Sequence, residues 1–187
     1  VFWAHLESTV ETADGALVSL IAISNITERK KTEEALAFQK SFLEEMLENM
    51  ETAIVACNEK GELILFNRVA REWHGLDSVS MPQEEWARHY NLRMRDGVTL
   101  MDTDAIPLVR AFHGEKVRGV EICIAAEGQP MRSVLTQASP IRGAEGRFLG
   151  AVAAMHDITK NKMAEEALMK FANAKSKFAS MVSHELK

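Results

Sequence analysis

The sequence predicts an α+β fold, with a five-stranded antiparallel sheet, helices on one side of it, and long amphipathic helices of the coiled-coil type at both ends. Three observations predict this class. Two short β-rich segments surround a turn at Lys60-Gly61, and three longer ones follow residue 115. Helical patterns fill the chain between these groups. Charged segments with apolar stripes precede and follow the whole region.

The composition is that of an ordinary globular protein. Apolar residues make up 47% and charged residues 26% of the 187 residues. The net charge of −5 argues against a nucleic-acid partner. The longest apolar stretch, residues 16–23, is much shorter than the ~20 residues that cross a bilayer. We therefore expect a cytoplasmic segment, and the sequence leaves open whether the parent protein has a membrane anchor elsewhere.

An internal repeat marks two strand-to-helix junctions. The segments DGALVSLIAISNITERKKTEEAL (14–36) and EGRFLGAVAAMHDITKNKMAEEAL (145–168) share an acidic-Gly turn, a β-rich stretch, Asn/Asp-Ile-Thr and a charged helix. Asn25 in the first copy matches Asp157 in the second, and this residue or the Thr two positions later is suited to cap the helix. Because 27 residues cannot bury a core, residues 1–27 are predicted to be the C-terminal strands of a preceding domain of the same kind.

The first helix, expected over residues 28–50, carries an apolar stripe. Leu36, Leu43, Met46 and Met50 follow each other at heptad-like spacing. A stripe of this kind has to be covered, either by a second helix in a homodimer or by the chain's own domain. The sequence leaves both interpretations open.

Between the two long helices, strand, helix and turn signals alternate. The expected elements are two strands over 53–67, a short helix over 68–76, a helix beginning at Pro82, a turn at 95–97, a helix over 102–115, and strands over 116–126, 131–141 and 147–158. Pro107 falls near the first turn of the 102–115 helix, where a missing N–H costs little, and Gly114 ends it.

This order of elements resembles a PAS sensor domain. The resemblance rests on a strand-turn-strand ending in LFN (65–67), the PLVRAFHGE helix (107–115), three strands and a terminal HDIT (156–159). It implies that residues 51–160 form a PAS domain, in which a five-stranded sheet closes over a small pocket and a helix leaves from the Asp-Ile-Thr end. By the same resemblance, residues 1–27 are similar to the last two strands of another PAS domain.

The resemblance does not fix what the pocket holds, because PAS domains carry haem, flavin, a small organic acid or nothing. The cysteine-bearing helix of flavin photosensors is absent. His113 is placed as a haem ligand would be, although a basic residue at a helix C-terminus is favourable without haem. Arg110 can meet an anionic ligand, and Cys123 lies in an apolar strand, so these three residues are the pocket candidates. His74 has no partner at ligand spacing, and no metal site is predicted.

The chain closes on KFASMVSHELK (177–187), on a signalling helix expected over 161–187. Leu168, Phe171 and Phe178 belong to its apolar stripe, and His184 lies off that stripe, facing water. With the stripe of the first helix, this pattern suggests a parallel homodimer through the linker helices.

KFASMVSHELK resembles the opening of the dimerisation and phosphotransfer domain of two-component sensor histidine kinases. Phe178 and the run from Ser183 to Lys187 match the family motif. The resemblance implies that His184 is the phosphoacceptor, which attacks the γ-phosphoryl group of ATP, and that Glu185 orients the imidazole and accepts its other proton. The phosphoryl group then passes to an aspartate on the receiver domain of a response regulator.

The chain itself shows no Gly-rich phosphate loop and no asparagine-bearing ATP-binding helix of that family. We therefore expect ATP and Mg²⁺ to bind a kinase domain outside this chain, and this chain to be inactive alone and without a cofactor of its own. The alternative is a PAS ligand-binding or dimerisation module of another signalling protein, such as a cyclase or a transcription regulator, in which SHEL arises by chance. The signal, the PAS ligand and the cognate response regulator are not predicted.

Overall fold

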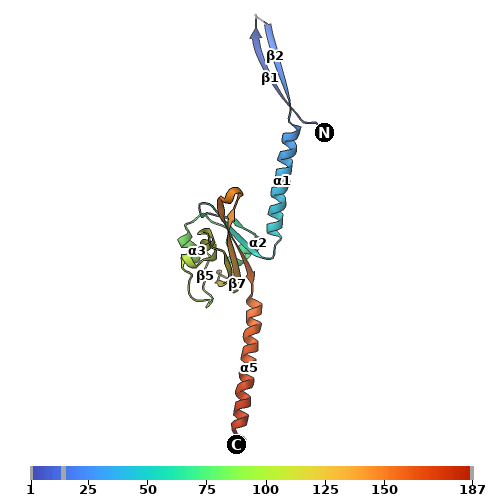
Figure 1. The fold of residues 1–187 in the computed structure, drawn as a ribbon. Helices are drawn as coiled ribbons and strands as arrows, with labels where there is room; N and C mark the ends of the chain where they lie inside the picture. The colour runs from blue at the N-terminus through green and yellow to red at the C-terminus, as the bar shows by residue number, and fades with distance from the viewer. Residues whose placement is uncertain (1, 14–15, 186–187) are drawn as a thin grey trace. The chain divides into compact units, whose positions relative to one another are not determined.

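The structure is a computed structural model that describes residues 2–13 and 16–185. The chain forms two compact units that divide between Met46 and Leu47 (Figure 1). No helix within the described ranges is long and apolar enough to cross a membrane.

The N-terminal unit is a hairpin followed by a long helix. Strands β1 (Ala4–Ala13) and β2 (Ala16–Asn25) pair antiparallel, with Ala4 opposite Asn25, and helix α1 runs over Thr27–Glu48. Leu6, Ile21 and Ile23 of this hairpin are exposed. Two-stranded hairpins are marginally stable at best on their own, so the hairpin is the kind of element that needs a covering layer.

The second unit is built on a six-stranded, entirely antiparallel sheet with the order β4-β3-β8-β7-β6-β5. Its strands are β3 (Ala53–Asn58), β4 (Leu63–Phe66), β5 (Leu92–Arg93), β6 (Val117–Ile124), β7 (Arg132–Arg142) and β8 (Phe148–Asp157). Its helical elements are α2 (Arg68–His74), α3 (Gln83–His89), the 3₁₀ turns η1 (Thr103–Ala105) and η2 (Ala144–Gly146), α4 (Pro107–Phe112) and α5 (Thr159–Glu185). The predicted α+β class and antiparallel sheet are confirmed.

One face of the sheet forms the core, because strand residues alternate between its two faces. On β7, Val134, Thr136 and Ala138 are buried, and on β8, Ala153 and Met155 are buried beside them. Helices α2, α3 and α4 supply the other half of the core with residues such as Trp73, Trp86 and Val109. Helices on one face of an antiparallel sheet are the arrangement expected from the sequence.

Two details of the prediction were wrong. The sheet has six strands, because Leu92 and Arg93 pair with the end of β6 as the short edge strand β5. The single helix expected over 102–115 is broken at Ile106, which is extended with φ −64° and ψ 122°. Ile106 precedes Pro107, and the proline ring disfavours helical backbone in the residue before it. Pro107 therefore opens the separate helix α4, and the chain leaves α4 through Gly114 at φ +96°.

The two strand-to-helix junctions share one hydrogen-bond pattern. At the second, the Thr159 N–H donates to the Asp157 carboxylate (2.8 Å), the Ser133 N–H donates to Thr159 Oγ1 (2.9 Å), and the Ile158 N–H donates to the Ser133 carbonyl (2.9 Å). Each bond holds the start of α5 to the end of β8 or the start of β7. The predicted capping role of the Asp-Ile-Thr segment is thus confirmed at this junction.

At the first junction the same three bonds recur with other residues. The Thr27 N–H donates to Asn25 Oδ1, the Trp3 N–H donates to Thr27 Oγ1, and the Ile26 N–H donates to the Trp3 carbonyl, each at 3.0 Å. The repeat found in the sequence is therefore a repeat of local structure as well.

Candidate functional site

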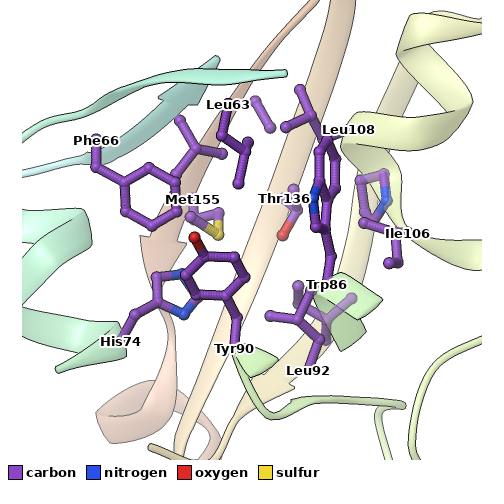
Figure 2. A pocket seen from close by; sticks show the side chains of 14 residues that line it. Leu63, Phe66, His74, Trp86, Tyr90, Leu92, Ile106, Leu108, Thr136 and Met155 are labelled. Atoms are coloured by element: carbon purple, nitrogen blue, oxygen red, sulfur yellow. The ribbon is translucent and has the colours of Figure 1, made fainter. Parts of the chain in front are cut away.

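The candidate site is a small cavity between the core face of the sheet and helices α2, α3 and α4. It encloses about 40 Å³. Figure 2 shows His74, Phe66 and Tyr90 on one side, Trp86, Ile106 and Leu108 on the other, and Thr136 and Met155 on the strands behind them. The remaining lining residues are Val55, Leu63, Leu92, Pro107, Ile122 and Ala153. Almost all of this wall is apolar, and no charged side chain contributes to it.

Local sequence explains how α2 brings His74 to this wall. Asn67 caps α2, since its Oδ1 accepts from the Ala70 N–H (3.1 Å), and Gly75 ends the helix in the left-handed region at φ +67°. These two residues limit α2 to two turns. His74 is its last residue, and its ring is only 5% exposed.

Asn67 also joins three segments around the cavity. Its side chain is fully buried, and its Oδ1 accepts from the Ile54 N–H of β3 (2.9 Å). Its Nδ2 donates to the carbonyls of Leu47 (3.0 Å) and Thr52 (2.8 Å). Every donor and acceptor of this amide is thus engaged, as a buried polar group requires. Asn67 is the last residue of the LFN sequence. That sequence served to recognise the fold, but the residue type alone did not predict that Asn67 joins these segments.

The aromatic polar groups around the cavity have partners outside it. The Tyr90 hydroxyl accepts from the Val79 N–H (3.0 Å) and donates to the Asp77 carbonyl (3.2 Å). The Trp86 Nε1–H donates to the Met81 carbonyl (3.3 Å). These rings therefore present their apolar surface to the cavity and fix its walls.

Two polar atoms of the wall are left over. His74 Nδ1 and Thr136 Oγ1 are buried and have no hydrogen-bond partner among the described residues. Thr136 is 1% exposed, and its hydroxyl points into the cavity from β7, as the His74 ring does from α2 (Figure 2). Burial lowers the pKa of His74 to about 4, and a hydrogen bond to the Tyr90 backbone offsets part of that shift. The ring is therefore neutral near pH 7.

The predicted pocket residues lie elsewhere. Arg110 makes an ion pair with Glu115, with Nε and Oε2 2.9 Å apart, and His113 is exposed, with Nδ1 3.0 Å from the Val109 carbonyl. Cys123 is buried, and its Sγ lies 3.7 Å from Ser133 Oγ. None of the three lines the cavity, whereas His74, which sequence reasoning set aside, does.

The size of the cavity bears on the cofactors considered from the sequence. A volume of about 40 Å³ holds roughly three water molecules at about 10–15 Å³ each. Sites for cofactor-sized ligands are commonly about 300–1,000 Å³. In this conformation the cavity fits neither haem nor flavin. Groups of three or more metal-ligating side chains are likewise missing from the described part of the chain.

The end of the sheet that leads into α5 is a second feature of interest. The Arg132 guanidinium donates to the Asp157 carboxylate (2.9 Å) and lies over the Trp73 ring, 5.6 Å from its centroid. In the first turn of α5, Lys162 Nζ lies 2.7 Å from Glu121 Oε2 on β6. Burial raises the pKa of Asp157, but hydrogen bonds from Thr159 and Arg132 outweigh this and hold it below its usual range.

The backbone of His184 and Glu185 belongs to the last turn of α5. Their side chains, including the expectation that His184 faces water, lie outside the described part of the structure, as do residues 186 and 187. The cavity and His184 are therefore at opposite ends of one continuous segment from β8 through α5.

Comparisons with known proteins identify the fold. Residues 47–162 match the sequence profile of a protein family whose description is PAS fold. Hybrid signal transduction histidine kinase I of Dictyostelium discoideum is 22% identical over 144 residues, which are 74% of this chain and 8% of that protein. The chain thus spans about 8% of the length of this curated relative.

Two solved structures show the same fold. The PAS domain of an HTR-like protein from Haloarcula marismortui superposes with a TM-score of 0.50 at 18% identity, covering 69% of this chain and 99% of that one. An RNA-binding light-oxygen-voltage receptor gives a TM-score of 0.55 at 15% identity, covering 74% of this chain and 38% of that one. Since the family profile covers well over half of the sequence, the chain belongs to the PAS-fold family.

Proposed function

We propose that this chain is the sensory and linker part of a two-component sensor histidine kinase, with His184 as the phosphoacceptor. The observation that carries the proposal is the Ser-His-Glu-Leu sequence at 183–186, whose first three residues lie on a helix that begins where the PAS sheet ends. The name of the Dictyostelium relative, a hybrid histidine kinase, supports the same class of parent protein.

In the proposed reaction, a ring nitrogen of neutral His184 attacks the γ-phosphorus of ATP in line. The bond from this phosphorus to the β,γ-bridging oxygen breaks, and ADP leaves. Glu185 takes up the proton of the other ring nitrogen and orients the imidazole. ATP and Mg²⁺ bind a separate kinase domain in this proposal, and the phosphoryl group passes on to a receiver-domain aspartate of a response regulator.

The proposed signal starts in the PAS unit and leaves through α5. The ion pair of Lys162 with Glu121 joins the first turn of α5 to β6, and that of Arg132 with Asp157 joins β7 to the end of β8, just before α5 begins. A small movement of these strands would therefore shift or rotate the helix that carries His184.

A parallel homodimer through the linker helices completes the proposal. Large apolar side chains of both helices are exposed, and Leu36, Phe42, Leu168 and Phe171 of the stripes are 56–71% exposed. Stripes of this kind fit a second helix from another copy of the chain. In the same way, the repeated junction and the exposed apolar residues of β1 and β2 support the proposal that this hairpin belongs to a preceding PAS-like domain.

The test is phosphorylation of the full-length parent protein with γ-labelled ATP, beside His184→Gln and His113→Gln versions. We expect acid-labile, base-stable label on the parent and on the His113→Gln protein, and none on the His184→Gln protein. If label is absent throughout, or survives His184→Gln, the kinase proposal fails. A PAS module with a different output, such as a cyclase or transcription regulator, then replaces it.

A further inference from the structure

We propose that the cavity binds a small uncharged molecule whose hydroxyl or N–H group donates a hydrogen bond to His74 Nδ1 and bonds Thr136 Oγ1. The inference rests on the proposed sensory function, in which such a molecule is the signal. It starts from the two wall atoms without partners, in residues that are 5% and 1% exposed. Unpartnered polar atoms this deeply buried are uncommon in proteins, because each one costs free energy.

The protonation of His74 decides which group it needs. The hydrogen bond between the His74 ring and the Tyr90 backbone raises the pKa of His74, so it favours the protonated ring. A backbone group has this effect only when its carbonyl accepts the bond, so the ring nitrogen that makes the bond carries a hydrogen. Because Nδ1 has no partner, we assign the ring hydrogen to Nε2. In the neutral ring Nδ1 then holds a lone pair and requires a donor from the ligand. The Thr136 hydroxyl can both donate and accept, so it can bond either a donor or an acceptor of the ligand.

Charge and size narrow the ligand further. No charged side chain lines the cavity, so a carboxylate or an ammonium group would lose its hydration without gaining a counter-ion. The volume of about 40 Å³ limits the ligand to roughly the space of three waters. The apolar walls favour methyl or methylene groups around the single polar group. A short-chain alcohol or a small primary or secondary amide has this chemistry.

A surface cleft shares two wall residues with the cavity. This cleft of about 490 Å³ lies beside it, and His74 and Tyr90 line both the cleft and the cavity. The cleft is otherwise formed by the end of α2, the end of α3 and the turn after β6, with Arg88 and Glu127 among its residues. The His74 and Tyr90 rings, 5.4 Å apart between centroids, thus lie between the cleft and the cavity, and in this proposal the ligand enters past them.

The experiment compares three probes with the same number of non-hydrogen atoms: 2-propanol, acetone and acetate. Acetone lacks the O–H donor, and acetate is charged. The methyl resonances of Met155 and Ala153, which line the cavity, are followed by NMR in the chain of residues 1–187, with exposed Met163 as an internal control. We expect saturable shifts with 2-propanol, about tenfold weaker binding of acetone, since one hydrogen bond to a buried group is lost, and none with acetate.

Two variants test the polar pair. Thr136→Val keeps the shape and removes an unpartnered hydroxyl, so the protein should fold at least as well, and His74→Phe keeps an aromatic ring. Each is expected to weaken 2-propanol binding about tenfold, whereas Thr103→Val, outside the cavity, should not. Equal binding of acetone and 2-propanol, or unchanged binding in both variants, overturns the proposal. The proposal is also overturned if 2-propanol gives no saturable shift, so that the cavity holds water only.

This experiment uses no ATP, and the phosphorylation test of His184 uses no cavity ligand. If His184 is labelled but 2-propanol does not bind, the ligand inference alone fails. If 2-propanol binds selectively but His184 is not labelled, the cavity remains a binding site and the kinase proposal fails.

Discussion

Burial of His74 makes the PAS unit sensitive to acid in a pH range where few carboxylates titrate. Its ring packs against Phe66 and Tyr90, and its pKa is lowered from 6.5 to about 4 because burial disfavours the charged form. Between these two values the unfolded chain binds a proton at His74 that the folded chain does not. The free energy of unfolding is therefore expected to fall as the pH drops from about 6.5 toward 4.

The magnitude follows from the two pKa values. Linkage between a folded pKa of about 4 and an unfolded value of 6.5 lowers the free energy of unfolding by about 2 kcal/mol on going from about pH 7.5 to about pH 5. Carboxylates whose pKa is lowered in the folded state, such as Asp157 and Glu121, lose their stabilisation only at lower pH. Stopping at about pH 5 therefore isolates most of the His74 effect.

The assay is urea unfolding followed by tryptophan fluorescence, because Trp73 and Trp86 are both buried in the PAS core. Chain concentration is held constant, since a dimer would make stability depend on it. His74→Phe should remove most of the pH dependence, and His113→Gln, which removes an exposed histidine, should keep it. If the native chain and His74→Phe lose equal stability at about pH 5, the buried neutral state assigned to His74 is wrong.

Three further predictions concern the scaffold. Asn67→Ala removes four hydrogen bonds from a fully buried side chain and should cost about 3–5 kcal/mol in urea unfolding. Asn67→Asp should be no milder, because a buried carboxylate oxygen would then face the Leu47 and Thr52 carbonyls. Gly150→Ala places a Cβ 2.0 Å from a backbone oxygen of β3 at φ +142° and should prevent folding or soluble expression, whereas Gly119→Ala, with a positive φ but open space, should cost about 1 kcal/mol. Arg132→Gln should raise the pKa of Asp157 and speed hydrogen exchange in the first turn of α5, while the free energy of unfolding changes by about 1 kcal/mol or less; unchanged exchange would separate Arg132 from the helix start.

Local patterns in the sequence predicted most of the fold. The strands around Lys60-Gly61, the three later strands and the Asp-Ile-Thr cap all lie where short-range signals placed them. The break at Ile106 was also open to local reasoning, since the residue before Pro107 is disfavoured in helices. Strand β5 was not, because two residues carry no periodicity, and only the neighbouring β6 turns them into a strand.

The cavity could not be predicted in this way, because its two polar atoms come from distant parts of the chain. His74 ends α2, Thr136 lies in the middle of β7, and the sheet order brings them to one wall. A histidine without nearby ligand-type residues looks unremarkable in sequence. Its burial, which lowers its pKa and keeps the ring neutral, is visible only in the structure. Arg110 looked functional as a partner for an anionic ligand, and His113 because of its place as a possible haem ligand. In the structure Arg110 pairs with Glu115, and His113 Nδ1 lies 3.0 Å from the Val109 carbonyl.

The two junctions of the repeat differ at one charged contact, and this difference bears on how the signal would leave the PAS unit. At the second junction Arg132 lies over Trp73, the neighbour of His74 in α2, and also pairs with Asp157, the last residue of β8 before α5. At the first junction Phe2 takes the place of Arg132, and Asn25 takes the place of Asp157. The hydrogen bonds of the junction are kept, but Phe2 and Asn25 cannot form an ion pair. A change in the packing of α2 can therefore be transmitted through an arginine to the following helix at the second junction only. A ligand that shifts α2 is expected to alter the start of α5 through this contact, and the first junction serves as a natural example of the same connection without it.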